Sequence, residues 1–203
     1  MKIICIGRNY AEHAAELGNE RPTQPVIFLK PDTALLRPNL PFYHPDFSKE
    51  IHYECEVVIR ISKEGKHIAP AFAHKYFEQI GLGIDFTARD LQNSLKTKGL
   101  PWELAKAFDN SAVCSPFFAK EEFPPLENVN FQLQVNGHLR QVGNTGEMLF
   151  SIPEIIAFVS QFFTLKIGDL IYTGTPKGVG KIEIGDVLEG SLEGKKVFSV
   201  EIK

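Results

Sequence analysis

The sequence has little cysteine, one tryptophan and no long apolar run. Its 203 residues include 3 Cys, 1 Trp and 2 Met. Three scattered cysteines without a CxxC spacing do not form a disulfide framework, and they favour free thiols in a reducing compartment. We therefore expect a cytoplasmic protein. No stretch approaches the roughly 18 apolar residues that a membrane helix needs, and the run after Met1 is too short for a signal peptide. We expect no membrane partner.

The sequence also lacks a basic run. The formal net charge is −3, so neither nucleic acid nor an anionic membrane is indicated as a partner. Hydrophobic residues make up 43% of the chain and charged residues 23%, which are ordinary values for a globular protein. We expect one domain over residues 1–203, because a chain of this length can bury a substantial core.

The hydrophobic pattern predicts a mainly β fold with few helices. We expect strands over 3–6, 26–30, 51–61 and 79–86, and a mostly β second half from residue 129 with a hairpin turn at Asn136-Gly137. Helices are predicted over 8–18, 87–98 and 152–163. In the first of these, Asn9 is a candidate cap, Glu12 its capping-box partner and Gly18 the residue after the last turn. This polar helix has little apolar surface to bury, which indicates a loosely held element.

Two glutamates stand side by side in the predicted strand over 51–61. Because side chains alternate between the faces of a strand, Glu54 and Glu56 project from the same face, with Cα atoms roughly 7 Å apart. The face could simply be solvated. Alternatively, the two carboxylates are hard oxygen ligands for Mg²⁺ or Mn²⁺. Asp85 is the candidate third ligand, because it ends an apolar, Gly-containing strand; its other possible role is to cap the helix that follows.

Other polar residues near these positions suit an anionic ligand. Arg89 and Gln92 share one helical face and can grip a carboxylate, although both could be ordinary exposed side chains. Lys106 stands among apolar residues and needs an anionic partner if it is buried; otherwise it is a surface lysine.

Two further features indicate groups for proton transfer and ligand binding. His13 and Glu16 are three residues apart on the polar helix, where a carboxylate can orient an imidazole as a general base, although most such pairs have no function. The Gly-rich loop 173–180 lacks Walker A spacing but offers amides and the Thr175 hydroxyl to an anion.

Several of these segments together resemble the fumarylacetoacetate hydrolase family, especially its small single-domain acylpyruvase and oxaloacetate-decarboxylase-like members. The similarity follows the family's order through most of the chain, in GRNYAEHAAELG (7–18), PVIFLKP (25–31), HYECEVVI (52–59), DFTARDLQ (85–92), KGLPWELAKAFD (98–109), VNGHLRQVGNTGEMLFSI (135–152) and GDLIYTGTPKGVG (168–180). Cys55 stands where an apolar residue is more usual, and Gly146-Glu147 also departs from the family pattern.

The resemblance implies a mixed β-sheet roll, a homodimer and a bound Mg²⁺ or Mn²⁺. It makes residues 8–20 a lid over the substrate. Matched position by position, it implies the following roles: Glu54, Glu56 and Asp85 as metal ligands; His13 and Glu16 as the base pair; Lys106 as the contact to substrate and enolate; and Arg89, Gln92 and Thr175 as substrate-binding groups.

Three functional hypotheses follow. The first is hydrolysis of a C–C bond in an acylpyruvate-like 2,4-dioxo acid, in which His13 activates water and the metal and Lys106 stabilise a pyruvate enolate. The second is decarboxylation of oxaloacetate, or isomerisation of a related oxo acid, at the same site. The third is a module that binds a metal or ligand without catalysis. In each enzymatic case the partner is a small oxo-carboxylate.

Overall fold

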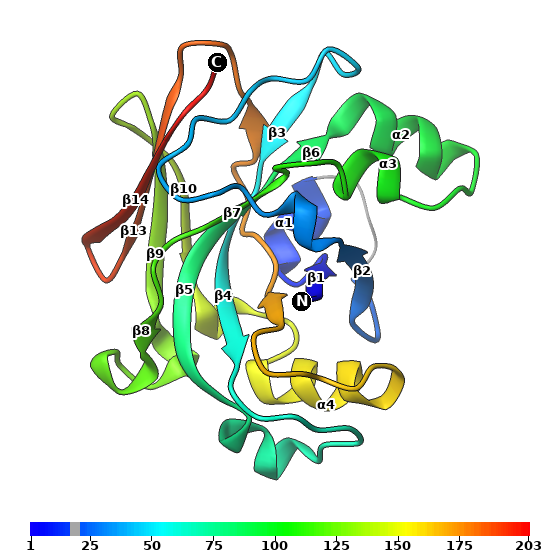
Figure 1. Ribbon diagram of the computed structural model, residues 1–203, viewed down its shortest axis with the longest axis vertical. Coiled ribbons are helices and arrows are strands. Elements are labelled where there is room, and N and C mark those ends of the chain that lie inside the picture. The colour runs from blue at the N-terminus through cyan, green and yellow to red at the C-terminus, as the bar shows by residue number, and fades with distance from the viewer. Residues whose placement is uncertain (17–20) are drawn as a thin grey trace.

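The computed structural model describes residues 1–16 and 21–203 and consists mainly of β strands (Figure 1). The strands are β1 (Ile3–Gly7), β2 (Val26–Lys30), β3 (Ile51–Tyr53), β4 (Cys55–Ile61), β5 (Phe77–Asp85), β6 (Thr87–Ala88), β7 (Ala112–Cys114), β8 (Phe118–Ala119), β9 (Asn130–Val135), β10 (His138–Asn144), β11 (Leu170–Tyr172), β12 (Gly180–Lys181), β13 (Val187–Leu192) and β14 (Lys195–Glu201). The α helices are α1 (Ala11–Glu16), α2 (Arg89–Thr97), α3 (Glu103–Lys106) and α4 (Ile152–Phe162). Short 3₁₀ helices span Asp32–Ala34, Pro70–Lys75, Lys120–Glu122, Leu126–Asn128 and Thr145–Glu147.

The described strands form a large mixed sheet, an antiparallel sheet and a small connecting sheet. The large sheet has the order β2-β1-β11-β4-β5-β7, with β8 also paired to β5. Its β1 and β11 run parallel, and β4 and β5 are antiparallel. The second sheet has the order β10-β9-β13-β14, and the third β12-β3-β6. The predicted mainly β fold with few helices is confirmed.

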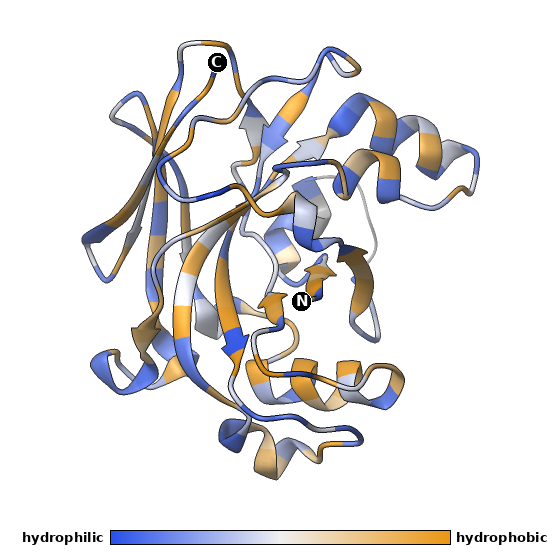
Figure 2. Ribbon diagram, in the orientation of Figure 1, coloured by the Kyte–Doolittle hydropathy of each residue, from blue (hydrophilic) through white to orange (hydrophobic). Residues whose placement is uncertain are grey.

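The core lies where the antiparallel sheet packs on the large sheet. Strand β13 contacts β5, and β9 contacts β4, so that Val57 and Leu82 of one sheet share a buried cluster with Leu133 and Leu188 of the other. Hydrophobic residues concentrate on β4, β1 and α4 (Figure 2). Helices α2 and α3 pack on each other near β3 and β6, at one end of the long strands β4 and β5 (Figure 1).

Local sequence signals account for several of these elements. Asn136 and Gly137 both have positive φ, 53° and 75°, which is the backbone of the two-residue turn that joins β9 to β10. Helix α4 starts with a capping box, in which the amide of Ser151 donates to Glu154 Oε2 at 2.8 Å. The predicted hairpin turn and the helix predicted over 152–163 are confirmed.

Two predicted elements are interrupted at positions that matter for the site. The strand expected over 51–61 breaks at Glu54, where the chain leaves the connecting sheet for the large sheet. The helix expected from residue 87 begins instead at Arg89, because residues 87–88 pair with β3 as strand β6. Asp85 therefore does not cap this helix; its cap position is Ala88, and the possible capping role was wrong.

The first helix begins later than expected and is not capped by Asn9. Helix α1 covers 11–16. The Asn9 side chain donates to the carbonyls of Thr173 and Phe150 and accepts from the Phe150 amide, so its oxygen is engaged outside the helix and the predicted cap was wrong. The expected role of Gly18, and the end of the predicted lid at residue 20, lie outside the described residues. Among the described helices, none has the length and apolar character that crossing a membrane requires.

Candidate active site

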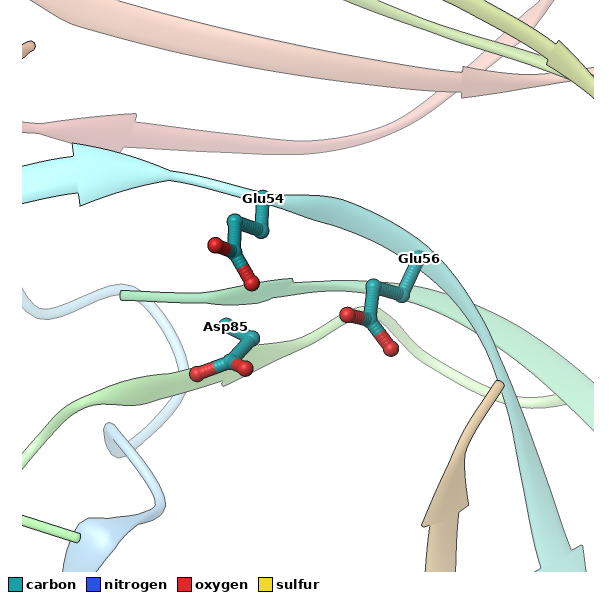
Figure 3. Close-up of side chains that lie close together, drawn as sticks. All are labelled: Glu54, Glu56 and Asp85. Atoms are coloured by element: carbon teal, nitrogen blue, oxygen red, sulfur yellow. The ribbon is translucent and has the colours of Figure 1, made fainter. Parts of the chain in front are cut away.

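Three carboxylates meet at the break between the two sheets. Glu54 lies between β3 and β4, Glu56 is on β4, and Asp85 ends β5. The three side chains are 5%, 2% and 0% exposed, and one oxygen from each lies within 4.8 Å of the others. Figure 3 shows their carboxylates directed toward a common space. Alternation along the strand segment thus placed Glu54 and Glu56 on one face as expected, and the face is buried instead of solvated.

Glu54 is surrounded by cations. Its Oε2 lies 2.7 Å from Lys106 Nζ, and its Oε1 pairs with Arg89 Nη2. Burial opposes ionisation of this carboxylate, but the charges of Lys106 and Arg89 outweigh it and hold the pKa of Glu54 well below its usual range. Glu54 is therefore charged in the folded protein.

Glu56 has a different environment, although it is only two residues away. Its Oε2 accepts a hydrogen bond from the Gly174 amide at 2.7 Å. Among the residues described, no basic side chain forms an ion pair with it. Burial, followed by the neighbouring Asp85 and Glu54 charges, raises the pKa of Glu56 well above its ordinary value. A buried carboxylate without a counter-charge is unfavourable, so this donor set fits a bound divalent cation.

Two lysines contact Asp85 from separate parts of the chain. Lys106 Nζ donates to Asp85 Oδ2 at 2.6 Å and to the Thr87 hydroxyl at 2.6 Å. Lys30 Nζ lies 2.7 Å from Asp85 Oδ1. Burial disfavours the charged form of Lys106, but Asp85 and Glu54 raise its pKa above the ordinary value. Lys106 is thus buried and does have anionic partners; they are the carboxylates of the cluster itself.

Arg89 and Gln92 lie beside the cluster on the first turn of α2. Arg89 Nη1 donates to Gln92 Oε1 at 2.6 Å, while Nη2 pairs with Glu54. Both side chains are 6% exposed, so they are not surface polar residues. In the described part of the chain, Arg89 Nε has no hydrogen-bond partner. Their predicted role in binding substrate remains a prediction.

The predicted pair on the polar helix is formed. His13 Nδ1 lies 3.1 Å from Glu16 Oε2, and the same carboxylate accepts a hydrogen bond from the Gly178 amide. The imidazole is 4% exposed. With the proton on Nδ1 shared with Glu16, Nε2 keeps a free lone pair, which is the arrangement a general base needs.

The loop 173–180 holds the cluster and α1 in place through its amides. Gly174 donates to Glu56 and Gly178 to Glu16. The Thr175 hydroxyl donates to the Cys55 carbonyl and accepts from Gln141 Nε2, both at 2.9 Å. Thr175 is therefore bonded to the backbone between the two glutamates, and its predicted contact with substrate remains a prediction. Cys55 itself is buried in the core, as its small apolar side chain suggested.

One small pocket joins most of the predicted residues. It has a volume of about 30 Å³ and is lined by Gly7, Arg8, His13, Phe28, Glu54, Arg89, Gln92, Lys96, Trp102 and Lys106. Binding pockets for organic ligands are usually on the order of 300–1,000 Å³. This space beside Glu54 is therefore too small for a 2-oxo acid unless a neighbouring element moves.

The sequence did not single out some residues that the structure places at the site. Lys30 is fully buried, and its Nζ also donates to Ser111 Oγ at 2.9 Å. Thr87, Gly174 and Gln141 hold other members of the site in place. Gly174 belongs to the Gly-rich loop whose amides the sequence did indicate. Lys30 could have been found as a charged residue directly after a short apolar run, where burial would require anionic partners.

Fold and site together define a β-rich enzyme with a buried carboxylate centre. The family model described as "Fumarylacetoacetate (FAA) hydrolase C-terminal" matches residues 2–201, and the chain belongs to this enzyme family. The resemblance and the fold that it implied are thereby confirmed, and a module without catalysis is set aside.

Individual relatives are similar over nearly the whole chain. The protein is 43% identical to bovine oxaloacetate tautomerase FAHD1, mitochondrial, over 99% of this chain and 90% of the relative. It is 42% identical to oxaloacetate decarboxylase, mitochondrial, from Dictyostelium discoideum, over 95% and 89%. The crystal structure of fumarylpyruvate hydrolase from Pseudomonas aeruginosa, in complex with Mn²⁺ and pyruvate, superposes with a TM-score of 0.93 at 36% identity, covering 100% of this chain and 89% of that one.

Proposed function

We propose that this protein hydrolyses a C–C bond in acylpyruvate-like 2,4-dioxo acids. The observation that carries the proposal is the His13–Glu16 pair. His13 lines the same pocket as Glu54 and Lys106, and its imidazole is oriented by a carboxylate at 3.1 Å. A base oriented in this way can activate the water that hydrolysis requires. The solved fumarylpyruvate hydrolase, with a TM-score of 0.93, supports the same chemistry.

The metal ligands in this proposal are Glu54, Glu56 and Asp85, and the ion is Mg²⁺ or Mn²⁺. Both ions prefer oxygen donors. Glu56 supports the assignment, because it is buried, no described basic side chain forms an ion pair with it, and its pKa is raised. When bound, the ion would supply a Lewis acid toward the carboxylate and 2-oxo group of the substrate.

The remaining steps of the proposed reaction are assigned to individual side chains. His13 Nε2 removes a proton from water, whose oxygen attacks the distal carbonyl, and Glu16 stabilises the resulting imidazolium. The C–C bond breaks so that its electron pair becomes the enolate of pyruvate, and the acyl fragment leaves as a carboxylic acid. Lys106 places its positive charge beside the developing oxyanion. Protonation of the enolate carbon yields pyruvate. Arg89, Gln92 and Thr175 are proposed to orient the substrate.

Substrate entry in this scheme requires α1 to move as a lid. Among its described residues only His13 is buried. Its other contacts with the loop 173–180 are an exposed ion pair between Glu12 and Lys177 at 2.9 Å and the bond from Gly178 to Glu16. Such exposed contacts contribute little to stability. The 30 Å³ pocket then corresponds to a closed arrangement, which excludes water other than the one that reacts.

A second candidate function is the decarboxylation or tautomerisation of oxaloacetate. It is favoured by the names of the two curated relatives at 42% and 43% identity. Both reactions pass through an enol or enolate of a 2-oxo acid, so they can use the same carboxylate centre and Lys106. In this case His13 would transfer a proton to or from the substrate and would not activate water.

The two functions are separated by assaying acetylpyruvate and oxaloacetate side by side. For hydrolysis, His13→Ala should abolish turnover of acetylpyruvate and leave Mn²⁺ affinity unchanged. Glu16→Gln should reduce kcat on the order of 10- to 100-fold, because general-base catalysis contributes about 10²–10⁴-fold and the variant keeps the base but not its charged partner. Unchanged hydrolysis in His13→Ala would remove the water-activating role, and turnover of oxaloacetate alone would establish the second function.

We also propose that the protein forms a cytoplasmic homodimer. Leu139 and Val142 of β10, the edge strand of the antiparallel sheet, are exposed apolar side chains, and such residues are common at interfaces between copies. Light scattering after gel filtration should give twice the mass of the chain, and Leu139→Glu should shift the equilibrium toward monomer.

A further inference from the structure

The aromatic ring of Phe28 covers one side of the Lys106 ammonium in the small pocket. Lys106 Nζ lies over this ring, 5.0 Å from its centre, which is within the distance at which the negative face of an aromatic ring attracts a cation. Both residues line the pocket that also contains Glu54. Because Lys106 is only 3% exposed, little water competes for its charge, and the attraction to the ring is stronger than it would be at the surface.

The three N–H groups of Lys106 are all engaged in the described structure. An ammonium has three donors, and three oxygens accept from it: Glu54 Oε2 at 2.7 Å, Asp85 Oδ2 at 2.6 Å and the Thr87 hydroxyl at 2.6 Å. To donate to a substrate oxyanion, Lys106 must therefore release one of these partners. The contact with the face of Phe28 uses no N–H group, so it can persist while a hydrogen bond is exchanged.

The Phe28 ring is itself held by its neighbours. Phe28 belongs to β2 and lies opposite Cys5 in the pairing of β2 with β1, and its side chain packs against a buried cluster that includes Cys5. Its ring centre lies 6.2 Å from that of Trp102, with the two planes tilted by 57°, which is a favourable arrangement for two aromatic rings. The ring therefore offers the ammonium a fixed place.

We propose that Phe28 is a positioning residue, whose ring holds the Lys106 ammonium by a cation–π contact while Lys106 donates to the developing enolate. The inference rests on the proposed function, in which Lys106 stabilises that enolate. An aliphatic side chain could fill part of the same space, but it has no π face. The contribution of Phe28 should therefore depend on the electron density of its ring and not only on its size.

The test changes the electron density of the ring and keeps its shape. Mono-, di- and trifluorinated phenylalanines are incorporated at position 28 by suppression of an amber codon, and each fluorine withdraws electron density from the ring face. With Mn²⁺ present, kcat and KM are measured for acetylpyruvate and oxaloacetate. Calorimetry measures the affinity for oxalate, a planar dianion that resembles the enolate of pyruvate, without turnover. The matched control is the same series at Phe72, whose ring centre lies 5.1 Å from Lys75 Nζ, outside the pocket.

The value of kcat should fall stepwise with each fluorine at position 28, to about 2- to 30-fold below the wild type for the trifluorinated ring, which is the range of a cation–π contact. KM should stay nearly constant, because the interaction is used in the transition state. The affinity for oxalate should fall in the same order, and the series at Phe72 should change neither quantity. Phe28→Tyr, which keeps the ring face, should retain most of the activity, whereas Phe28→Leu should lose at least as much as the trifluorinated ring.

A kcat that is equal for all fluorinated rings and falls only in Phe28→Leu would show that the ring serves packing alone, and would overturn the proposal. An equal effect of the Phe72 series would also overturn it. If the wild type binds oxalate but turns over neither acid, the proposed function fails, and the oxalate series still decides whether Phe28 holds Lys106. If oxalate does not bind either, both fail. Thermal unfolding shows whether each variant is folded, and the fluorinated rings keep the test decisive if Phe28→Leu is not.

Discussion

Glu54 and Glu56 project from the same face of one chain segment, yet their surroundings shift their pKa values in opposite directions. Burial acts on both carboxylates. At Glu54 the charges of Lys106 and Arg89 outweigh it and lower the pKa, whereas at Glu56 the carboxylates of Asp85 and Glu54 add to it and raise the pKa. The metal-free protein therefore has one stabilised and one destabilised carboxylate at the same centre.

This difference predicts opposite effects of two matched substitutions. Glu56→Gln should leave the free energy of unfolding of the metal-free protein unchanged or raise it, because a neutral amide needs no counter-charge and can still accept from Gly174. Glu54→Gln leaves Lys106 and Arg89 without their partner and should lower it by about 3–5 kcal/mol. Urea unfolding in the presence of EDTA measures both.

The affinity of the same two variants for Mn²⁺ is measured by calorimetric titration. Each variant lacks one of three oxygen ligands, so both should bind Mn²⁺ much more weakly than the wild type. A loss of metal-free stability in Glu56→Gln as large as that in Glu54→Gln would show that Glu56 does have a balancing charge. Undiminished Mn²⁺ binding in either variant would remove that residue from the ligand set.

Lys30 contacts Asp85 of the carboxylate centre. Its substitution should therefore destabilise the fold. Its ammonium is fully buried against Asp85 and Ser111. Lys30→Met keeps the length of the side chain but leaves Asp85 with one lysine fewer, which should lower the free energy of unfolding by about 3–5 kcal/mol. The measurement is urea unfolding at neutral pH. Lys177→Met removes only an exposed partner of Glu12 and should leave stability unchanged; an equal loss in both variants would contradict the prediction.

The environment of Asp169, which is not part of the candidate active site, leads us to expect that the stability of the protein depends on pH. Burial opposes its charge, but hydrogen bonds from the side chain and amide of Lys2 and from the Lys166 amide lower the pKa of Asp169. A carboxylate with a lowered folded-state pKa stabilises the protein above the unfolded-state pKa, about 3.9, and this contribution is lost as the pH falls through the folded-state pKa.

The corresponding variant is Asp169→Asn. It should lower the free energy of unfolding at pH 7 by about 1–3 kcal/mol, since hydrogen bonds to a charged acceptor are lost. The difference from the wild type should shrink in thermal unfolding scans as the pH is lowered below about 4. A difference that stays constant from pH 7 to pH 3 would mean that the charge of Asp169 is not what stabilises this contact.

Local periodicity was enough to predict much of the fold and the placement of several residues of the candidate site. Alternation along 51–61 placed Glu54 and Glu56 on one face, and the position of Asp85 after an apolar strand placed a third carboxylate at a strand end. The i, i+3 spacing of His13 and Glu16 predicted their hydrogen bond. Each of these relationships lies within one short chain segment, where backbone geometry alone relates one side chain to the next.

The local signals failed where pairing with distant strands decided the backbone. Residues 87–88 join β3 and delay the helix to Arg89, and Asn9 bonds to segments more than 140 residues away instead of capping its own helix. In both cases the hydrogen-bond partners come from segments distant in the sequence, so the neighbouring residues could not indicate them.

The sequence by itself determined the mainly β class, the shared face of Glu54 and Glu56 and the family to which the chain belongs. Only the tertiary structure decided in which direction the pKa of each carboxylate is shifted. Lys30, Lys106 and Gly174 come from positions up to 118 residues away from the carboxylates that they contact. The pKa of a buried group depends on the charges and donors within a few ångströms, and strand pairing, not sequence spacing, brings those groups together.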